Sequence, residues 1–168
     1  MEQPVLLMTR LSLAIARFCI AAWIGAAILF VIVGVREVTV PEFTSEVKDR
    51  LVTLRFPAYY IAGTSLVGLA FVASVVASAN RASWGLRIAL AMLLLAGGLM
   101  AADYVWIYSP LAAMVTPPGQ ARTMAFVTLH HWSMRINTAH LAACMIAAVA
   151  LFATGLKSRQ RDNSPLAD

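Results

Sequence analysis

The sequence predicts an all-α membrane protein: a four-transmembrane-helix antiparallel bundle with an amphipathic interfacial helix between helices 1 and 2. Two observations predict this fold class. The 168-residue chain is 61% hydrophobic and 12% charged, whereas soluble domains are about half apolar and about a quarter charged. The apolar residues also form four runs, each long enough to cross a bilayer, which takes about 20 helical residues.

The first span is expected at residues 18–35, where an apolar run follows Arg17. A cleaved signal peptide has a shorter apolar core and a small-residue cleavage site, so we interpret this run as a transmembrane helix. In the following segment, residues 36–55, Thr39 and Glu42 have the spacing of a capping box. Apolar residues then recur three and four positions apart, which predicts an amphipathic helix lying on the membrane surface.

The second and third spans are expected at residues 56–79 and 86–108. The polar loop between them is short, which predicts that these two helices are antiparallel neighbours. Ser109 and Pro110 are expected to end the third helix, and a turn-rich loop that reaches Gly119 follows.

The fourth span is expected at residues 124–156, with a disordered polar tail at about 158–168. Of the 13 Lys and Arg residues, seven lie at the end of the molecule that holds both termini, five at the opposite end, and Arg135 within the fourth span. Because basic residues favour the cytoplasmic side, we expect both termini in the cytoplasm. The expected location is the inner membrane of a bacterium.

The fourth span contains all three histidines of the chain. At about 100° per residue, its polar side chains share one sector of the helix. These residues are His130, Ser133, Asn137, His140 and Cys144. Polar groups in a membrane helix turn toward protein or water rather than lipid, so this face is the candidate site. Its possible ion-pair partners are Asp103, Arg135 and His131.

Several kinds of chemistry remain open on this polar face. Imidazole and thiolate suit copper or zinc, and His140 and Cys144 lie four residues apart on one helix face, so they are candidate metal ligands. Haem bound by two histidines of one protomer is disfavoured because all the histidines lie on one helix, which leaves haem at a dimer interface or with one histidine ligand. Asp103 paired with His130 or Arg135 would serve proton or ion passage, or a structural salt bridge.

A short pattern in the fourth span, Phe126-x-x-Leu129-His130-x-x-Ser133-x-x-x-Asn137, resembles the last-helix signature of the transmembrane protein 205-like family. Trp23-Ile-Gly25 and Tyr108-Ser-Pro110 are similar to two further motifs of that family. The family is a bacterial and eukaryotic domain of unknown function. The resemblance implies a four-helix membrane protein in which His130, Ser133 and Asn137 form the polar face.

The chain departs from this family after the first helix, where Pro41-Glu-Phe43 stands in place of Pro-x-x-Phe. His131, Arg135 and His140 have no counterpart in the family pattern. These departures concern the subfamily more than the fold.

We therefore expect a small, non-enzymatic integral membrane protein with a structural or accessory role, or a role in transport or resistance. The alternative is a metal- or haem-binding membrane subunit that uses the polar face of the fourth helix; otherwise no cofactor is expected. The expected partners are the lipid bilayer and a larger membrane complex or a homo-oligomer. Nucleic acid is not expected, because the net charge of +5 is explained by basic residues at the ends of the spans.

Overall fold

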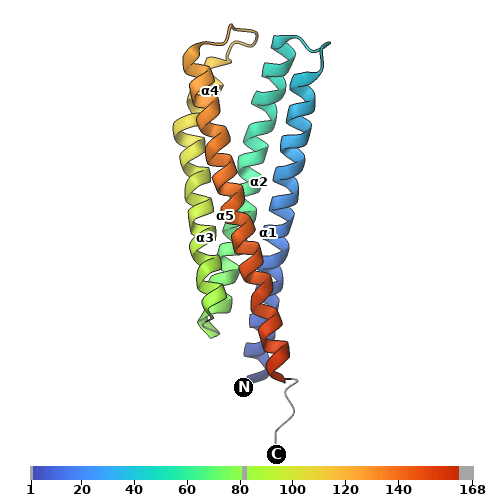
Figure 1. The fold of residues 1–168 in the computed structure, drawn as a ribbon, viewed down its shortest axis with the longest axis vertical. Coiled ribbons are helices and arrows are strands. Elements are labelled where there is room, and N and C mark those ends of the chain that lie inside the picture. The colour runs from blue at the N-terminus through green and yellow to red at the C-terminus, as the bar shows by residue number, and fades with distance from the viewer. Residues whose placement is uncertain (1, 81–82, 163–168) are drawn as a thin grey trace, which may run out of the picture.

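The computed structural model of this protein describes residues 2–80 and 83–162. Long helices lie side by side along the molecule, and the start of α1 and the end of α5 lie at the same end (Figure 1). The elements are α1 (Glu2–Thr39), α2 (Ser45–Asn80), α3 (Trp84–Asp103), the π-helix η1 (Tyr104–Tyr108), α4 (Ser109–Met114) and α5 (Met124–Asp162). The prediction of an all-α chain is confirmed for the described residues.

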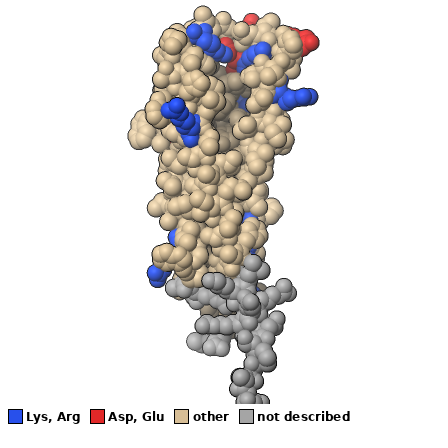
Figure 2. Space-filling model, viewed as in Figure 1, with Lys and Arg blue, Asp and Glu red and all other residues tan. Residues whose placement is uncertain are grey.

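Four helical segments are long and apolar enough to cross a membrane, judged by length and composition. They are α1, α2, α5 and the continuous segment formed by α3, η1 and α4. Charged side chains gather at the end of the molecule opposite the termini, and the middle of the visible face has few of them (Figure 2). This distribution agrees with the expectation of four apolar spans.

Small residues fill much of the interior, while many large apolar residues face outward. Alanines of all four long segments are fully buried, among them Ala16, Ala70, Ala89 and Ala147. By contrast, Phe18 is 72% exposed. Small residues at helix interfaces let backbones approach closely, as is typical of helix packing in membranes. The helices pack most extensively in two pairs, α1 with α2 and α3 with α5.

The separate interfacial helix predicted between the first two spans is not present. Residues 45–55 are instead the first turns of α2, which continues without a break to Asn80. Thr39 ends α1, and its hydroxyl donates to the carbonyls of Val35 and Arg36, so it does not begin a helix. Thr44 takes the N-cap role, because its hydroxyl accepts from the backbone N–H of Val47 at 3.4 Å.

The third helix does not end at Ser109 and Pro110, as predicted, but continues through α4 to Met114. A proline inside an α-helix clashes with the carbonyl four residues earlier. Here the wider π-helical turn of η1 precedes it, and the backbone N–H and hydroxyl of Ser109 both donate to the carbonyl of Tyr104. The wider turn lets the helix accommodate Pro110.

The first and last helices are longer than the predicted spans. α1 already begins at Glu2, well before residue 18. α5 begins at Met124, as predicted for the fourth span, and remains helical to Asp162, although a disordered tail was expected from about residue 158. Residues 163–168 of that predicted tail lie outside the described residues.

Candidate functional site

Asp103 lies at the centre of a buried polar cluster between α2, α3 and α5. Its side chain is at the last residue of α3, directly before η1, and is 1% exposed. Three donors reach the same oxygen, Oδ2: the Tyr60 hydroxyl at 2.6 Å, the Asn137 amide at 2.9 Å and the Ser133 hydroxyl at 3.3 Å. The other oxygen, Oδ1, has no hydrogen-bond partner among the described residues.

Asn137 connects this cluster to a neighbouring tyrosine. Its Nδ2 donates to Asp103 and, at 3.0 Å, to the backbone carbonyl of Ser133, while its Oδ1 accepts from the Tyr59 hydroxyl at 3.1 Å. In this orientation the amide nitrogen faces two acceptors and the amide oxygen faces a donor, so both ends of the Asn137 side chain are hydrogen-bonded. The result is a network that joins α2, α3 and α5 through side chains.

His140 forms a second buried polar contact, which joins α1, α3 and α5. The indole N–H of Trp23 donates to its Nε2 at 2.8 Å, and its Nδ1 lies 2.9 Å from the carbonyl oxygen of Ala96. An indole can only donate, so Nε2 bears no proton and Nδ1–H donates to Ala96. Cys144 Sγ lies 3.7 Å from the same Nε2. Both ring nitrogens of His140 are thus used in helix packing.

A large cavity lies beside the Asp103 cluster, with a volume of about 930 Å³. Its walls are mainly apolar and come from α1, α2, η1, α4 and α5. It extends from Lys48 near the loops to Ala27 and Met145 deeper between the helices. Ser133, Asn137 and Tyr59 also line it. Asp103 itself does not line the cavity, but it is hydrogen-bonded to Ser133 and Asn137, which do.

The end of this cavity near the loops is basic. Lys48, Arg122 and His130 line it there. Arg122 forms an ion pair with the buried Asp49, and its guanidinium lies 4.4 Å from the ring centroid of Phe126. In Figure 2 a hollow is visible in the face of the molecule near this end, with Lys and Arg side chains and some acidic ones around it. Because the charge of Arg122 is already paired with Asp49, Lys48 is the lining residue near the loops whose charge has no ion-pair partner among the described side chains. The cavity thus combines apolar walls with a few basic side chains at one end.

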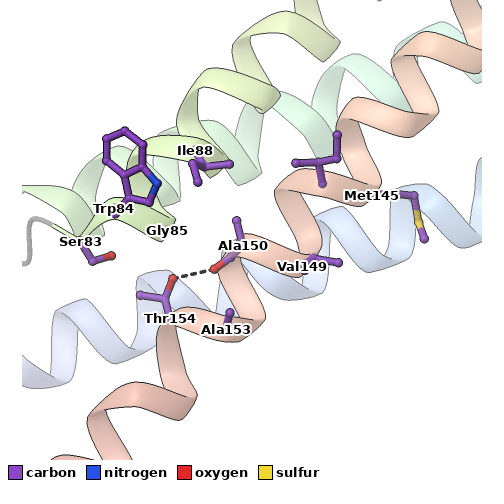
Figure 3. Close-up of a pocket in the computed structure, with 10 residues that line it drawn as sticks. Ser83, Trp84, Gly85, Ile88, Met145, Val149, Ala150, Ala153 and Thr154 are labelled. Atoms are coloured by element: carbon purple, nitrogen blue, oxygen red, sulfur yellow. Dashed lines mark hydrogen bonds between the residues drawn. The ribbon is translucent and has the colours of Figure 1, made fainter.

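A second groove, shown in Figure 3, lies between the start of α3 and the second half of α5. Its volume is about 560 Å³, and Trp84, Ile88 and Val149 are among the residues that line it. The hydroxyl of Thr154 donates to the carbonyl of Ala150 rather than into the groove. None of the described residues that line it has an ionisable side chain, so the groove offers no group for acid–base chemistry.

The structure brings most of the predicted polar face together. Ser133, His140 and Cys144 are buried and Asn137 is half-buried. His130 is exposed but lines the cavity.

The predicted ion-pair partners do not meet. His131 is exposed, and Arg135 is exposed with its guanidinium 5.2 Å from the ring centroid of Trp132. Asp103 takes part in no ion pair among the side chains that the structure describes, those of residues 3–79 and 83–154. The pairing of Asp103 with His130 or Arg135, considered from the sequence, is therefore absent, because hydroxyl and amide donors surround this carboxyl instead.

Sequence reasoning missed two tyrosines and one tryptophan of the site. Tyr60 is buried, and the hydroxyl groups of Tyr59 and Tyr60 both point into the polar network. The available signal was that the second apolar run contains two tyrosine hydroxyl groups, and the short loop after it makes this helix a neighbour of the helix with Asp103. For Trp23 the signal was weaker, since only the tertiary structure places its N–H against His140.

No cluster of three or more His, Cys, Asp or Glu side chains able to hold a metal ion occurs in the part of the chain that the structure describes. For His140 and Cys144, the predicted metal ligands, metal binding would require His140 to give up its bond from Trp23 or to Ala96. The geometry of these two residues therefore favours a packing role.

No family model, curated protein or solved structure matches the chain. The resemblance to the transmembrane protein 205-like family stays a prediction based on its short motifs.

Proposed function

We propose that this chain is an integral membrane protein whose four long helical segments cross the bilayer as an antiparallel bundle. In this proposal, the cavity beside Asp103 binds a small amphiphilic molecule with an acidic head group. The many outward-facing large apolar side chains and the alanine-rich interior support a lipid environment, since a water-soluble protein rarely exposes extended apolar surface. The single observation on which the binding function rests is the large apolar cavity with a basic opening.

The volume and lining of the cavity support this class of ligand. Sites for small molecules typically have volumes of about 300–1,000 Å³ and mainly apolar walls with a few polar groups, and this cavity has about 930 Å³. A flexible hydrocarbon tail would contact the residues near Ala27 and Met145, which line its deeper part. The head group would lie among Lys48, Arg122 and His130. Arg122 is already held in place by Asp49, so it is oriented before a ligand arrives.

The distribution of basic residues supports an orientation with both termini in the cytoplasm of a bacterial cell. The opening of the cavity then faces the outer side of the inner membrane. A cavity of this kind on a small membrane protein supports a role in transport or resistance, either alone or as an accessory component of a larger complex. The proposed role is non-enzymatic and consists of binding and transfer.

A metal- or haem-binding role has less support. His140 is bonded through both ring nitrogens, and His130 and His131 lie exposed near the loops. A haem would therefore need a second copy of the chain or a ligand of another type.

Binding of oleic acid and of its methyl ester to the purified protein in nanodiscs tests the proposal. The two molecules share one tail, but only the acid has a charge. We expect the acid to bind more tightly, and Lys48→Gln to weaken its binding by about tenfold, the effect of about 1.4 kcal/mol. Arg87→Gln is the matched control, because Arg87 is exposed near the opposite end of the molecule and should leave binding unchanged. Equal affinities for acid and ester would overturn the proposal, as would normal binding by the Lys48→Gln protein.

A further inference from the structure

Two buried aspartates of this chain differ in how many of their carboxyl oxygens have a hydrogen-bond or ion-pair partner. Both Asp49 and Asp103 are 1% exposed. At Asp49 each oxygen has a partner, because Gly119 N–H donates to Oδ2 at 2.8 Å and Arg122 donates to Oδ1. At Asp103 all three donors reach Oδ2, and Oδ1 has no partner among the residues described.

The surroundings of Asp103 also supply no positive charge. Among the side chains that the structure describes, the ion pairs join Arg50 with Glu46, Arg55 with Glu37 and Arg122 with Asp49. A buried carboxylate without a cationic partner is disfavoured unless hydrogen bonds to both oxygens replace its hydration, and here the three donors reach Oδ2 alone. An ionisable residue inside a membrane helix is therefore a candidate functional site, and proton relays are one of its known uses.

We propose that Asp103 is a proton-binding site, with the proton on Oδ1. A proton there makes the side chain neutral and leaves Oδ2 free to accept from Tyr60, Asn137 and Ser133. The three donors explain which oxygen is protonated, because they all converge on Oδ2. A metal cation fits less well, since it needs several oxygen lone pairs directed at it, whereas these three groups direct hydrogens at the carboxyl.

The other titratable groups near Asp103 do not supply the missing charge. Tyr60 bonds to it directly and Tyr59 through Asn137. The rings of Tyr104 and Tyr108 on η1 each lie 5.0 Å, between centroids, from that of Tyr60. On α5, His140 and Cys144 follow Asn137, and the Nε2 lone pair of His140 already accepts from Trp23. From α1 the cluster is approached by the indole of Trp23, which does not titrate.

The proton would exchange between Asp103 and the cavity past the side chains that separate them. Ser133 and Asn137 both line the cavity and both bond to Asp103. A rotation of either side chain would expose the carboxyl to the cavity. This exchange route depends on the proposed open cavity, whereas protonation of Asp103 does not.

Infrared spectroscopy of the protein in nanodiscs tests the proposal. A protonated carboxyl gives a carbonyl-stretch band separate from the bands of carboxylates, and the band shifts in D₂O when the proton exchanges. We expect such a band in the wild-type protein, its loss in Asp103→Asn, and its retention in Asp49→Asn, because Asp49 is paired with Arg122. Circular dichroism checks that each variant is folded.

Three outcomes would overturn the assignment of the proton: no band in the wild-type protein, a band that persists in the Asp103→Asn protein, or a band lost only in Asp49→Asn. If Asp103→Asn does not fold, Tyr60→Phe decides the question, because loss of the 2.6 Å bond to Oδ2 should shift the band if it belongs to Asp103, and an unshifted band would overturn the assignment. A band that depends on Asp103 but does not shift in D₂O would overturn the exchange route alone. Failure of fatty-acid binding with an exchanging band would overturn the binding function but leave the proton site in place.

Discussion

The indole N–H of Trp23 on α1 donates to Nε2 of His140 on α5 across 2.8 Å, although the two residues are 117 positions apart in the sequence. Both side chains are 1% exposed. The same imidazole donates to the carbonyl of Ala96 on α3, so one histidine connects three helices. This contact fixes the tautomer of His140 and the place of α1 against α5.

Replacing Trp23 by phenylalanine should lower the free energy of unfolding by about 1–3 kcal/mol, because a buried acceptor on His140 loses its donor. Thermal unfolding of the purified protein in detergent measures this change. Trp84→Phe is the matched control, since Trp84 is 74% exposed, and its effect should stay within about 0.5 kcal/mol. Equal losses in the two variants would argue against a structural role for the Trp23–His140 bond.

Gly63 makes room for Trp23 on the neighbouring helix α2. A Cβ at position 63 would lie 2.5 Å from Cη2 of Trp23, whereas a Cβ at Gly68 would meet nothing within 4 Å. We expect Gly63→Ala to lower the unfolding free energy by about 1–3 kcal/mol through overpacking. Gly68→Ala should be neutral or stabilise the helix by up to about 1 kcal/mol. Comparison of the two melting temperatures tests this difference in sign, and a stabilised Gly63→Ala protein would contradict it.

Tyr60→Phe removes the shortest hydrogen bond that Asp103 receives, the one at 2.6 Å. The expected loss of stability is about 1–3 kcal/mol, because the buried carboxyl keeps only its two longer contacts. Tyr104→Phe is the control: its ring is partly exposed at 45%, and its effect should be below about 0.5 kcal/mol. Unfolding by heat in detergent, followed by circular dichroism, distinguishes the variants. A stable Tyr60→Phe protein would mean that Oδ2 of Asp103 does not depend on this donor.

The proposed orientation can be tested by cysteine labelling in intact bacterial cells. Both native cysteines, Cys19 and Cys144, are buried and should give little background. Gln120→Cys lies in the exposed loop before α5, and Gln3→Cys is exposed near the N-terminus. With both termini in the cytoplasm, a membrane-impermeant maleimide should label position 120 in intact cells, and position 3 only after the cells are opened. The reverse result would invert the orientation.

The sequence predicted the helices better than it predicted their ends. Span length and hydropathy identify four helical segments correctly, because these depend on runs of apolar residues. Thr39 was expected to begin a helix and instead ends one, since its hydroxyl can bond backward to carbonyls of α1 as readily as forward. Pro110 was expected to end a helix, but the wider turn of η1 accommodates it. A threonine or a proline near a helix end is compatible with more than one backbone structure, and packing with the rest of the chain decides which one forms.

For the candidate site, the sequence determined which face of the last helix turns inward, because the helical period places Ser133, Asn137 and His140 on one face and polar side chains in an apolar helix turn toward protein. It did not determine their partners. Tyr60, Trp23 and the orphan oxygen of Asp103 became visible only in the tertiary structure. The physical reason is that helical periodicity fixes the direction of a side chain on its own helix, whereas a hydrogen bond also depends on the height and rotation of the neighbouring helix, and these are set by packing of the whole bundle.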